Sequence, residues 1–193
     1  QVFDYIKHAA DYGITVQDAK PDFGAMVKRS RASADGMSKG VQFLMKKNKI
    51  DVVAGTGKLK SGGSIEVKSS DGKIQTIQSK NIIIATGARS RELPGFKQDG
   101  KKIIGYREAM SLDKQPKSMV VIGSGAIGVE FAYFYHTLGT KITIVEFMPE
   151  VVPLEDEDIS KQLARSFKKT GITIMTESTV ESVDTSGSGC MVN

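Results

Sequence analysis

The sequence predicts an α/β fold, and three features of the 193-residue chain support that prediction. Two short apolar runs, 119–122 and 142–145, flank a helical pattern, which is typical of buried parallel strands joined through a helix. Three short alternating segments, with an Asp-Gly dipeptide at 71–72, predict a small antiparallel meander. A long helical pattern over 23–48 precedes that meander. We therefore expect helices together with one parallel and one antiparallel sheet.

A glycine-rich turn stands between the first apolar run and the helix that follows it. Gly123, Gly125 and Gly128 form the pattern Gly-x-Gly-x-x-Gly. The first glycine allows a tight turn, the second lets a pyrophosphate approach the backbone, and the third lets the helix pack against the strand. Ala126 and Ile127 begin that helix, whose free N–H groups attract phosphate. The segment therefore predicts a dinucleotide site.

Glu146 closes the second apolar run, about 20 residues beyond the turn. A carboxylate at this place accepts hydrogen bonds from ribose hydroxyls and repels a 2′-phosphate. No arginine follows it, since the next residues are Phe147, Met148 and Pro149. We therefore expect NAD rather than NADP, bound by a Rossmann-like domain. The alternative is a glycine-rich turn in an ordinary α/β domain with an unoccupied crevice.

The first half of the chain has its own predicted elements. Residues 1–12 read as a helix stopped by Gly13, and Asp22 is placed to cap the long helix after it. Two apolar runs, 50–54 and 81–84, are predicted as buried strands. The meander lies between them and consists of three segments: 58–60, 64–68 and 74–78.

Composition argues against several other classes of protein. The net charge is +5, but the lysines are scattered and not interleaved with aromatic residues, which favours solvated helix faces over nucleic-acid binding. No run reaches the roughly 18 apolar residues of a membrane span. The single cysteine, Cys190, predicts neither a disulfide framework nor a cysteine metal site. His8 and His136 are isolated in helical patterns, so we expect surface or packing roles for them rather than catalysis, and no metal site.

In their order along the chain, these pieces resemble the flavin-dependent pyridine nucleotide–disulfide oxidoreductases, and among them the dihydrolipoamide dehydrogenases most. The resemblance extends over the whole chain. It rests on the segments 43–50, 55–57, 82–89, 123–130, 144–149 and 151–158. It implies an incomplete FAD-binding domain over 1–88, made of a helix, parallel strands and the three-stranded meander. A linker over 89–116 and a truncated NAD-binding domain over 117–193 follow.

The resemblance also implies a role for individual residues. Those expected to contact or adjoin FAD are Gly57, Ala85, Thr86 and Gly87. Those that match the NAD site are Gly123, Gly125, Ala126, Ile127, Gly128 and Glu146. Glu130 matches the family's acid near the nicotinamide and flavin rings, although in the sequence it is simply an acid early in a helix.

The implied reaction passes electrons from dihydrolipoamide through a redox-active cysteine pair and FAD to NAD. Neither the cysteine pair nor the family's first FAD glycine loop is present, and Cys190 matches neither redox cysteine. We therefore expect an internal fragment that is inactive alone and whose partner is the remainder of the parent enzyme. The resemblance implies a homodimeric parent within a 2-oxoacid dehydrogenase complex or glycine cleavage system. Its expected location is the bacterial cytoplasm or, in a eukaryote, the mitochondrial matrix.

Two other functions remain open from the sequence. One is a different reductase of the same superfamily, such as a mercuric reductase, an NADH oxidase or a transhydrogenase. The other is a non-catalytic NAD-binding module that has lost redox chemistry, with which the single Cys190 is consistent. A nucleic-acid-binding protein is a distant third, because only the net charge favours it.

Overall fold

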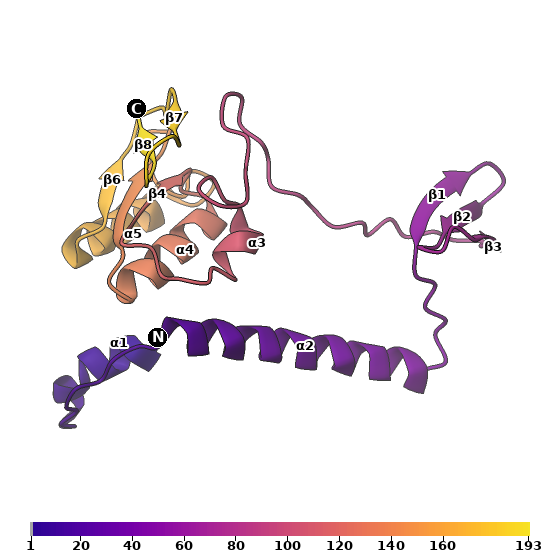
Figure 1. The fold of residues 1–193 in the computed structure, drawn as a ribbon, viewed down its shortest axis with the longest axis horizontal. Helices are drawn as coiled ribbons and strands as arrows, with labels where there is room; N and C mark the ends of the chain where they lie inside the picture. Colours follow the sequence, from indigo (N-terminus) through magenta and orange to yellow (C-terminus); the bar gives the residue numbers. More distant parts are fainter. Residues whose placement is uncertain (1) are drawn as a thin grey trace. The chain divides into compact units, whose positions relative to one another are not determined.

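The computed structural model describes residues 2–193, which form two compact units (Figure 1). The first unit contains the residues up to Arg31 together with Ser90–Asn193, and the second contains Ala32–Arg89. A parallel sheet lies in the first unit and an antiparallel sheet in the second. The predicted α/β class is therefore confirmed.

The parallel sheet of the first unit has the strand order β4-β5-β6. Its strands are β4 (Ser118–Ile122), β5 (Lys141–Val145) and β6 (Thr173–Met175). Helix α4 (Ala126–Thr137) connects β4 to β5, and α5 (Glu157–Thr170) connects β5 to β6. The predicted strand–turn–helix–strand arrangement is confirmed, with Ile122 of β4 opposite Val145 of β5.

Burial differs between the strands of this sheet. The central strand β5 has Ile142 and Ile144 fully buried, as expected for a parallel strand with both neighbours present. The apolar run of β4 predicts a strand buried on both faces. This prediction is wrong, because Val120 and Ile122 are exposed. The strand lies at the edge of the sheet, and only its other face, with Met119 and Val121, packs against the core.

Helix α4 is the main packing element of the first unit. Its residue Tyr135 is fully buried, and the ring packs 5.9 Å from that of Phe23, the first residue of α2 (Phe23–Lys47). The Tyr135 hydroxyl donates a hydrogen bond of 2.5 Å to the carbonyl oxygen of Ala109 in the short helix α3 (Tyr106–Ala109). Burial raises the pKa of Tyr135 to about 12, so its hydroxyl stays protonated as a donor.

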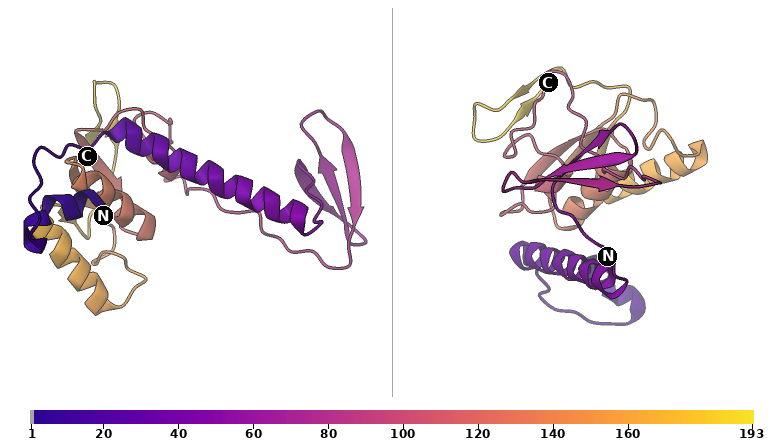
Figure 2. Two further views of the ribbon diagram at one scale, coloured as in Figure 1. Left: turned by 90° about the horizontal axis from the view of Figure 1, so that it is seen from below. Right: turned by 90° about the vertical axis from the view of Figure 1, so that its right-hand side faces the viewer.

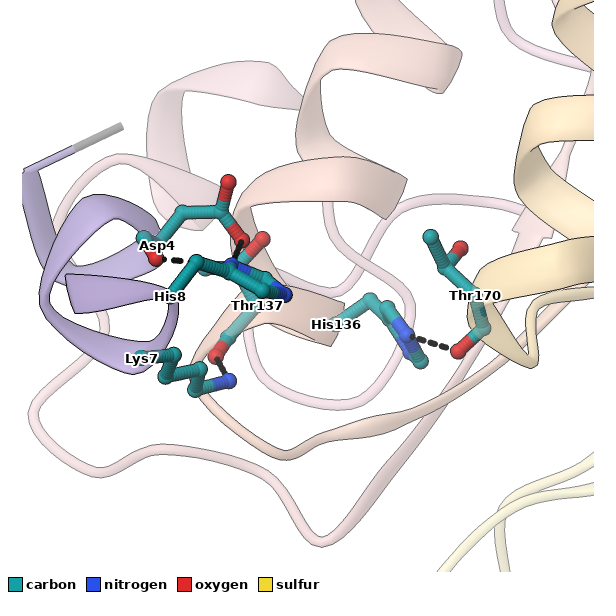
Figure 3. Close-up of polar contacts among 6 residues, drawn as sticks. All are labelled: Asp4, Lys7, His8, His136, Thr137 and Thr170. Atoms are coloured by element: carbon teal, nitrogen blue, oxygen red, sulfur yellow. Dashed lines mark hydrogen bonds and ion pairs between the residues drawn. The ribbon is translucent and has the colours of Figure 1, made fainter. Parts of the chain in front are cut away.

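Basic side chains meet the carboxyl ends of α4 and α5 (Figure 3). Lys7, at the end of α1 (Val2–Lys7), donates to the carbonyl oxygen of Thr137. His136 Nε2 lies 2.8 Å from the carbonyl oxygen of Thr170. The last carbonyls of a helix have no partner within it, so these contacts satisfy them and join neighbouring helices. His136 thus has a packing role in the structure.

Shorter elements complete the first unit. After α1, the 3-10 helix η1 (Ala9–Tyr12) ends at Gly13 with φ +71, as predicted. Residue 1 of that predicted helix lies outside the described residues. Near the end of the chain, β7 (Val183–Asp184) and β8 (Met191–Val192) form an antiparallel pair. Lys102 Nζ holds the turn between them by donating to the carbonyl oxygens of Thr185 and Gly187.

The antiparallel sheet of the second unit has the order β1-β2-β3 (Figure 2). The strands are β1 (Thr56–Lys60), β2 (Ser64–Lys68) and β3 (Ile74–Gln78), which confirms the predicted meander. The Asp-Gly turn joins β2 to β3, with Gly72 at φ +85 and its N–H donating to the carbonyl oxygen of Ser69.

Helix α2 begins where its predicted cap places it. Asp22 Oδ1 accepts a hydrogen bond of 2.9 Å from the N–H of Ala25, which satisfies a free donor of the first turn. Further along, the predicted apolar stripe is exposed: Met37 is 74% exposed, and Val41 and Leu44 are each about half exposed. In the described part of the chain, this face of α2 has no apolar cover.

The prediction of strands at 50–54 and 81–84 is wrong for this structure. Neither segment forms a strand, and Ile83, within the second segment, is 91% exposed. A strand is stable only when its backbone groups pair with a neighbour and its side chains are covered. Residues 2–193 provide no parallel partner for either segment, so apolar composition alone does not make them strands.

Within residues 2–193, no helix has the length and apolar character needed to cross a bilayer.

Replacing Tyr135 by phenylalanine tests the packing of α4. We expect Tyr135→Phe to lower the free energy of unfolding by about 1–3 kcal/mol, because the buried carbonyl of Ala109 loses its donor. Urea unfolding followed by circular dichroism measures the change. Tyr133→Phe on the same helix removes a hydroxyl from an exposed ring and is the matched control. Equal effects of the two substitutions would contradict this account.

Candidate functional site

The three glycines of the turn differ in their physical surroundings. Gly123 has φ +92, a left-handed conformation that favours glycine. A Cβ atom at Gly128 would lie 2.3 Å from the carbonyl oxygen of Gly123 and 3.3 Å from Val121 Cγ1, so only glycine allows α4 to approach β4 this closely. A Cβ at Gly125 would meet nothing within 4 Å, so the backbone there faces open space. Gly123 and Gly128 therefore have the turn and packing geometry predicted for them, and Gly125 has the open backbone that its predicted role requires.

The amino end of α4 is not capped by a side chain. Its N-cap is Gly125, and the first intrahelical bond runs from the N–H of Val129 to the Gly125 carbonyl. By contrast, α5 is capped by Asp156 and α2 by Asp22. The N–H groups of the first turn of α4, on Ala126 and Ile127, have no acceptor within the helix. They form the positive end of the helix dipole and can bind an anion.

Glu146 follows β5 and faces this turn. It is only 7% exposed, and its Oε2 accepts hydrogen bonds of 2.7 Å from both the N–H and the hydroxyl of Ser124. Its Oε1 accepts a bond of 2.8 Å from the N–H of Met148. Glu146 is therefore hydrogen-bonded directly to Ser124, the residue between the first two glycines of the turn.

These contacts keep Glu146 ionised. Burial alone raises the pKa of the carboxyl group. The hydrogen bonds from the Met148 N–H and from the Ser124 hydroxyl and N–H outweigh that effect, so the pKa lies below its usual value. A negative charge at the end of β5 accepts hydrogen bonds from hydroxyl groups and repels phosphate.

Two residues of this region were missed by sequence reasoning. Ser124 is fully buried and is the hydrogen-bond partner of Glu146. Val152 has φ +43, which is rare for a β-branched residue and costs about 1–3 kcal/mol. Its N–H donates to Ser124, at 3.1 Å from the carbonyl oxygen and 3.2 Å from Oγ. The one available signal was a polar residue between two glycines; nothing in the sequence indicates the conformation of Val152.

Glu130 lies one turn into α4 and is exposed. It lines a groove of about 340 Å³ between α4 and α5, together with Tyr133 of its own helix and Ser166 and Thr170 of α5. The floor of the groove is apolar and includes Val129 and Phe167. Glu130 is the acidic residue among those that line the groove.

The residues predicted to contact FAD belong to the second unit. Gly57 lies on β1, and Ala85, Thr86 and Gly87 lie in the irregular stretch after 81–84. All four are exposed. These residues therefore do not by themselves enclose a flavin nucleotide.

Between residues 2 and 193, no cluster of three or more histidine, cysteine or acidic side chains is arranged to hold a metal ion. Cys190 is exposed, with Sγ 3.8 Å from the carbonyl oxygen of Lys102.

Comparison with known proteins gives a family match over nearly the whole chain. A model of the pyridine nucleotide-disulphide oxidoreductase family matches residues 6–192. Dihydrolipoyl dehydrogenases of Chlorobaculum tepidum and Zymomonas mobilis are 46% and 41% identical to the chain over 189 and 185 residues. These matches include 98% and 95% of this chain but only 40% and 39% of the relatives. The chain thus spans about two fifths of the length of the curated relatives it matches.

Solved structures give the same picture. The crystal structure of LpdA from Mycobacterium tuberculosis superposes with a TM-score of 0.90 at 27% identity, over 100% of this chain and 42% of that one. The HOCl-induced flavoprotein disulfide reductase RclA from Escherichia coli superposes with a TM-score of 0.76 at 24% identity, over 99% of this chain and 42% of that one. The second match shows likeness of fold alone.

Two alanine substitutions test whether Gly128 is needed for packing while Gly125 faces open space. We expect Gly128→Ala to lower the free energy of unfolding by about 1–3 kcal/mol, because its Cβ would collide with a backbone carbonyl that cannot move aside. Gly125→Ala has open space and φ −62, so we expect a change within about 0.5 kcal/mol. Thermal and urea unfolding measure both. A Gly125→Ala variant as unstable as Gly128→Ala would contradict the geometry described.

Proposed function

Because the chain belongs to the pyridine nucleotide-disulphide oxidoreductase family, we propose that its glycine turn and Glu146 form an NAD-binding site. The family resemblance predicted from the sequence is confirmed, and membership implies FAD and NAD as cofactors. The assignment of NAD to particular residues of this chain is our proposal.

The observation that supports the site most directly is the uncapped amino end of α4 beside a buried, ionised acid. The N–H groups of Ala126, Ile127 and Gly128 would hold the pyrophosphate, and the bare backbone at Gly125 leaves room for it. Glu146 would accept a hydrogen bond from a ribose hydroxyl and disfavour a 2′-phosphate. Bound NAD would supply the hydride acceptor of the reaction. Glu130 is proposed, by resemblance alone, to lie near the rings.

The wider role of the chain is also a proposal. It would be part of a dihydrolipoyl dehydrogenase-like flavoprotein that oxidises dihydrolipoamide and passes electrons through a redox disulfide and FAD to NAD. Its FAD contacts would be at Gly57 and 85–87, within the domain 1–88; the linker 89–116 and the NAD domain 117–193 would follow. The relatives are named dihydrolipoyl dehydrogenases, which supports a parent that works in an oxoacid dehydrogenase complex. The glycine cleavage system and a homodimeric parent are proposed from the resemblance alone. Those relatives are bacterial, which favours the bacterial cytoplasm and gives no support to a mitochondrial location.

NADH titration tests the proposed site. We expect NADH to bind saturably, with enhanced fluorescence, and NADPH to bind at least about tenfold more weakly because Glu146 repels its 2′-phosphate. We expect Gly125→Ala to weaken NADH about tenfold or more, since a methyl group displaces the pyrophosphate from its charge-assisted hydrogen bonds. Circular dichroism checks that the variant is folded. Equal affinity for NADH and NADPH, or no loss in Gly125→Ala, would refute the assignment.

A second experiment concerns the chain as expressed alone. We expect it to purify without stoichiometric FAD, because the residues that would contact FAD are exposed. We also expect no reduction of NAD with dihydrolipoamide, since one cysteine cannot form an intramolecular redox disulfide. Visible absorbance and a coupled NADH assay measure the two properties. A flavin band at one FAD per chain, or turnover above background, contradicts this part of the proposal.

A further inference from the structure

We propose that Ser124 is a positioning residue that holds the Glu146 carboxylate for ribose recognition, an inference that rests on the proposed NAD site. Ser124 lies between Gly123 and Gly125, and its side chain is fully buried. In this account it does not contact the cofactor with its hydroxyl. It acts through Glu146, with which it makes two hydrogen bonds of 2.7 Å.

The Ser124 hydroxyl joins three segments of the chain. It belongs to the glycine turn, it bonds to Glu146 Oε2 at the end of β5, and it accepts from the N–H of Val152 at 3.2 Å. Val152 is itself held from the other side, because its carbonyl oxygen accepts from the N–H of Glu155 at 2.9 Å and from Ser160 Oγ at 3.4 Å. The hydroxyl is therefore anchored by a segment outside the turn.

The chemistry of its neighbours fixes the direction of the hydroxyl hydrogen. An ionised carboxylate can only accept hydrogen bonds, and the backbone N–H of Val152 can only donate. The hydrogen of Ser124 Oγ must therefore point at Glu146 Oε2. A hydroxyl fixed in one orientation by both neighbours restrains the carboxylate more than a freely rotating one.

This arrangement also limits what Glu146 can offer to a ligand. Oε2 already accepts two hydrogen bonds, both from Ser124, while Oε1 accepts one, from the N–H of Met148. The backbone N–H of Phe147 also interacts favourably with the carboxylate. Ser124 thus occupies both acceptor sites of Oε2, so a ribose hydroxyl would bond to Oε1.

A double-mutant cycle distinguishes positioning from simple packing. NADH dissociation constants are measured for the unmodified chain, Ser124→Ala, Glu146→Ala and the double variant. We expect Ser124→Ala to weaken NADH about tenfold and Glu146→Ala at least as much. If Ser124 acts through Glu146, the double variant binds no more weakly than Glu146→Ala. No loss in Ser124→Ala, or the same tenfold loss in the Glu146→Ala background, overturns the proposal.

Ser160→Ala is the matched control, because Ser160 is an equally buried serine that also bonds to Val152 but does not contact Glu146. We expect it to lower the melting temperature, because a buried hydroxyl is removed, while leaving NADH affinity within about twofold. If it weakens NADH as much as Ser124→Ala does, the effect is one of packing and the proposal is wrong.

The outcomes separate this inference from the NAD site itself. If the unmodified chain does not bind NADH, or Glu146→Ala binds it normally, the proposed function fails and the inference fails with it. If Glu146→Ala loses affinity while Ser124→Ala does not, only the inference fails. Should Ser124→Ala not fold at the assay temperature, Ser124→Cys keeps the side-chain volume with a weaker donor. It is then expected to show the same loss of NADH affinity, and normal affinity would overturn the proposal.

Discussion

The close approach of α4 to the end of β4 is the contact on which the other features of the site depend. The absence of a Cβ at Gly128 brings the helix within reach of the Gly123 carbonyl, which fixes where the helix begins. That start leaves the first N–H groups uncapped and directed outward from the turn. It also sets Ser124 against the carboxylate of Glu146. A helix shifted by the width of a methyl group would alter all of these contacts together.

The two units differ in how well their residues are covered. Around β5 the apolar side chains are buried and the polar groups are hydrogen-bonded, whereas apolar side chains of the unit Ala32–Arg89 are exposed. Around β5, buried isoleucines and fully bonded side chains such as Tyr135 hold helices and sheet together. In the unit Ala32–Arg89, the backbone is paired in the meander and in the last part of α2, but the helix stripe at Met37 faces solvent. This contrast agrees with a chain that spans about two fifths of its relatives' length. It also explains why the residues of the proposed NAD site have defined surroundings, while Gly57 and residues 85–87, proposed to contact FAD, are exposed.

What could be predicted from the sequence depends on the range of the interaction involved. The glycine spacing, the Asp22 cap and the Asp-Gly turn are local, because each is decided by a few neighbouring residues. The strands at 50–54 and 81–84 were predicted from composition, yet strand formation needs a partner that no local pattern supplies. Ser124 and Val152 went unrecognised for a related reason. Their importance arises from hydrogen bonds between residues more than 20 positions apart in the sequence, which the folded structure brings together.

The exposed segment 81–84 has a consequence for handling the protein. Three successive isoleucines, Ile82 to Ile84, lie in an unpaired stretch, and the side chains of Ile83 and Ile84 are largely in water. Such a stretch can add to the edge of any sheet, including one in a second copy of the chain. Pairing of this kind depends on concentration and buries apolar surface, so warming within the physiological range strengthens it. Cold, dilute solutions at low ionic strength, where the net charge of +5 keeps copies apart, are accordingly the conditions that favour a monodisperse chain.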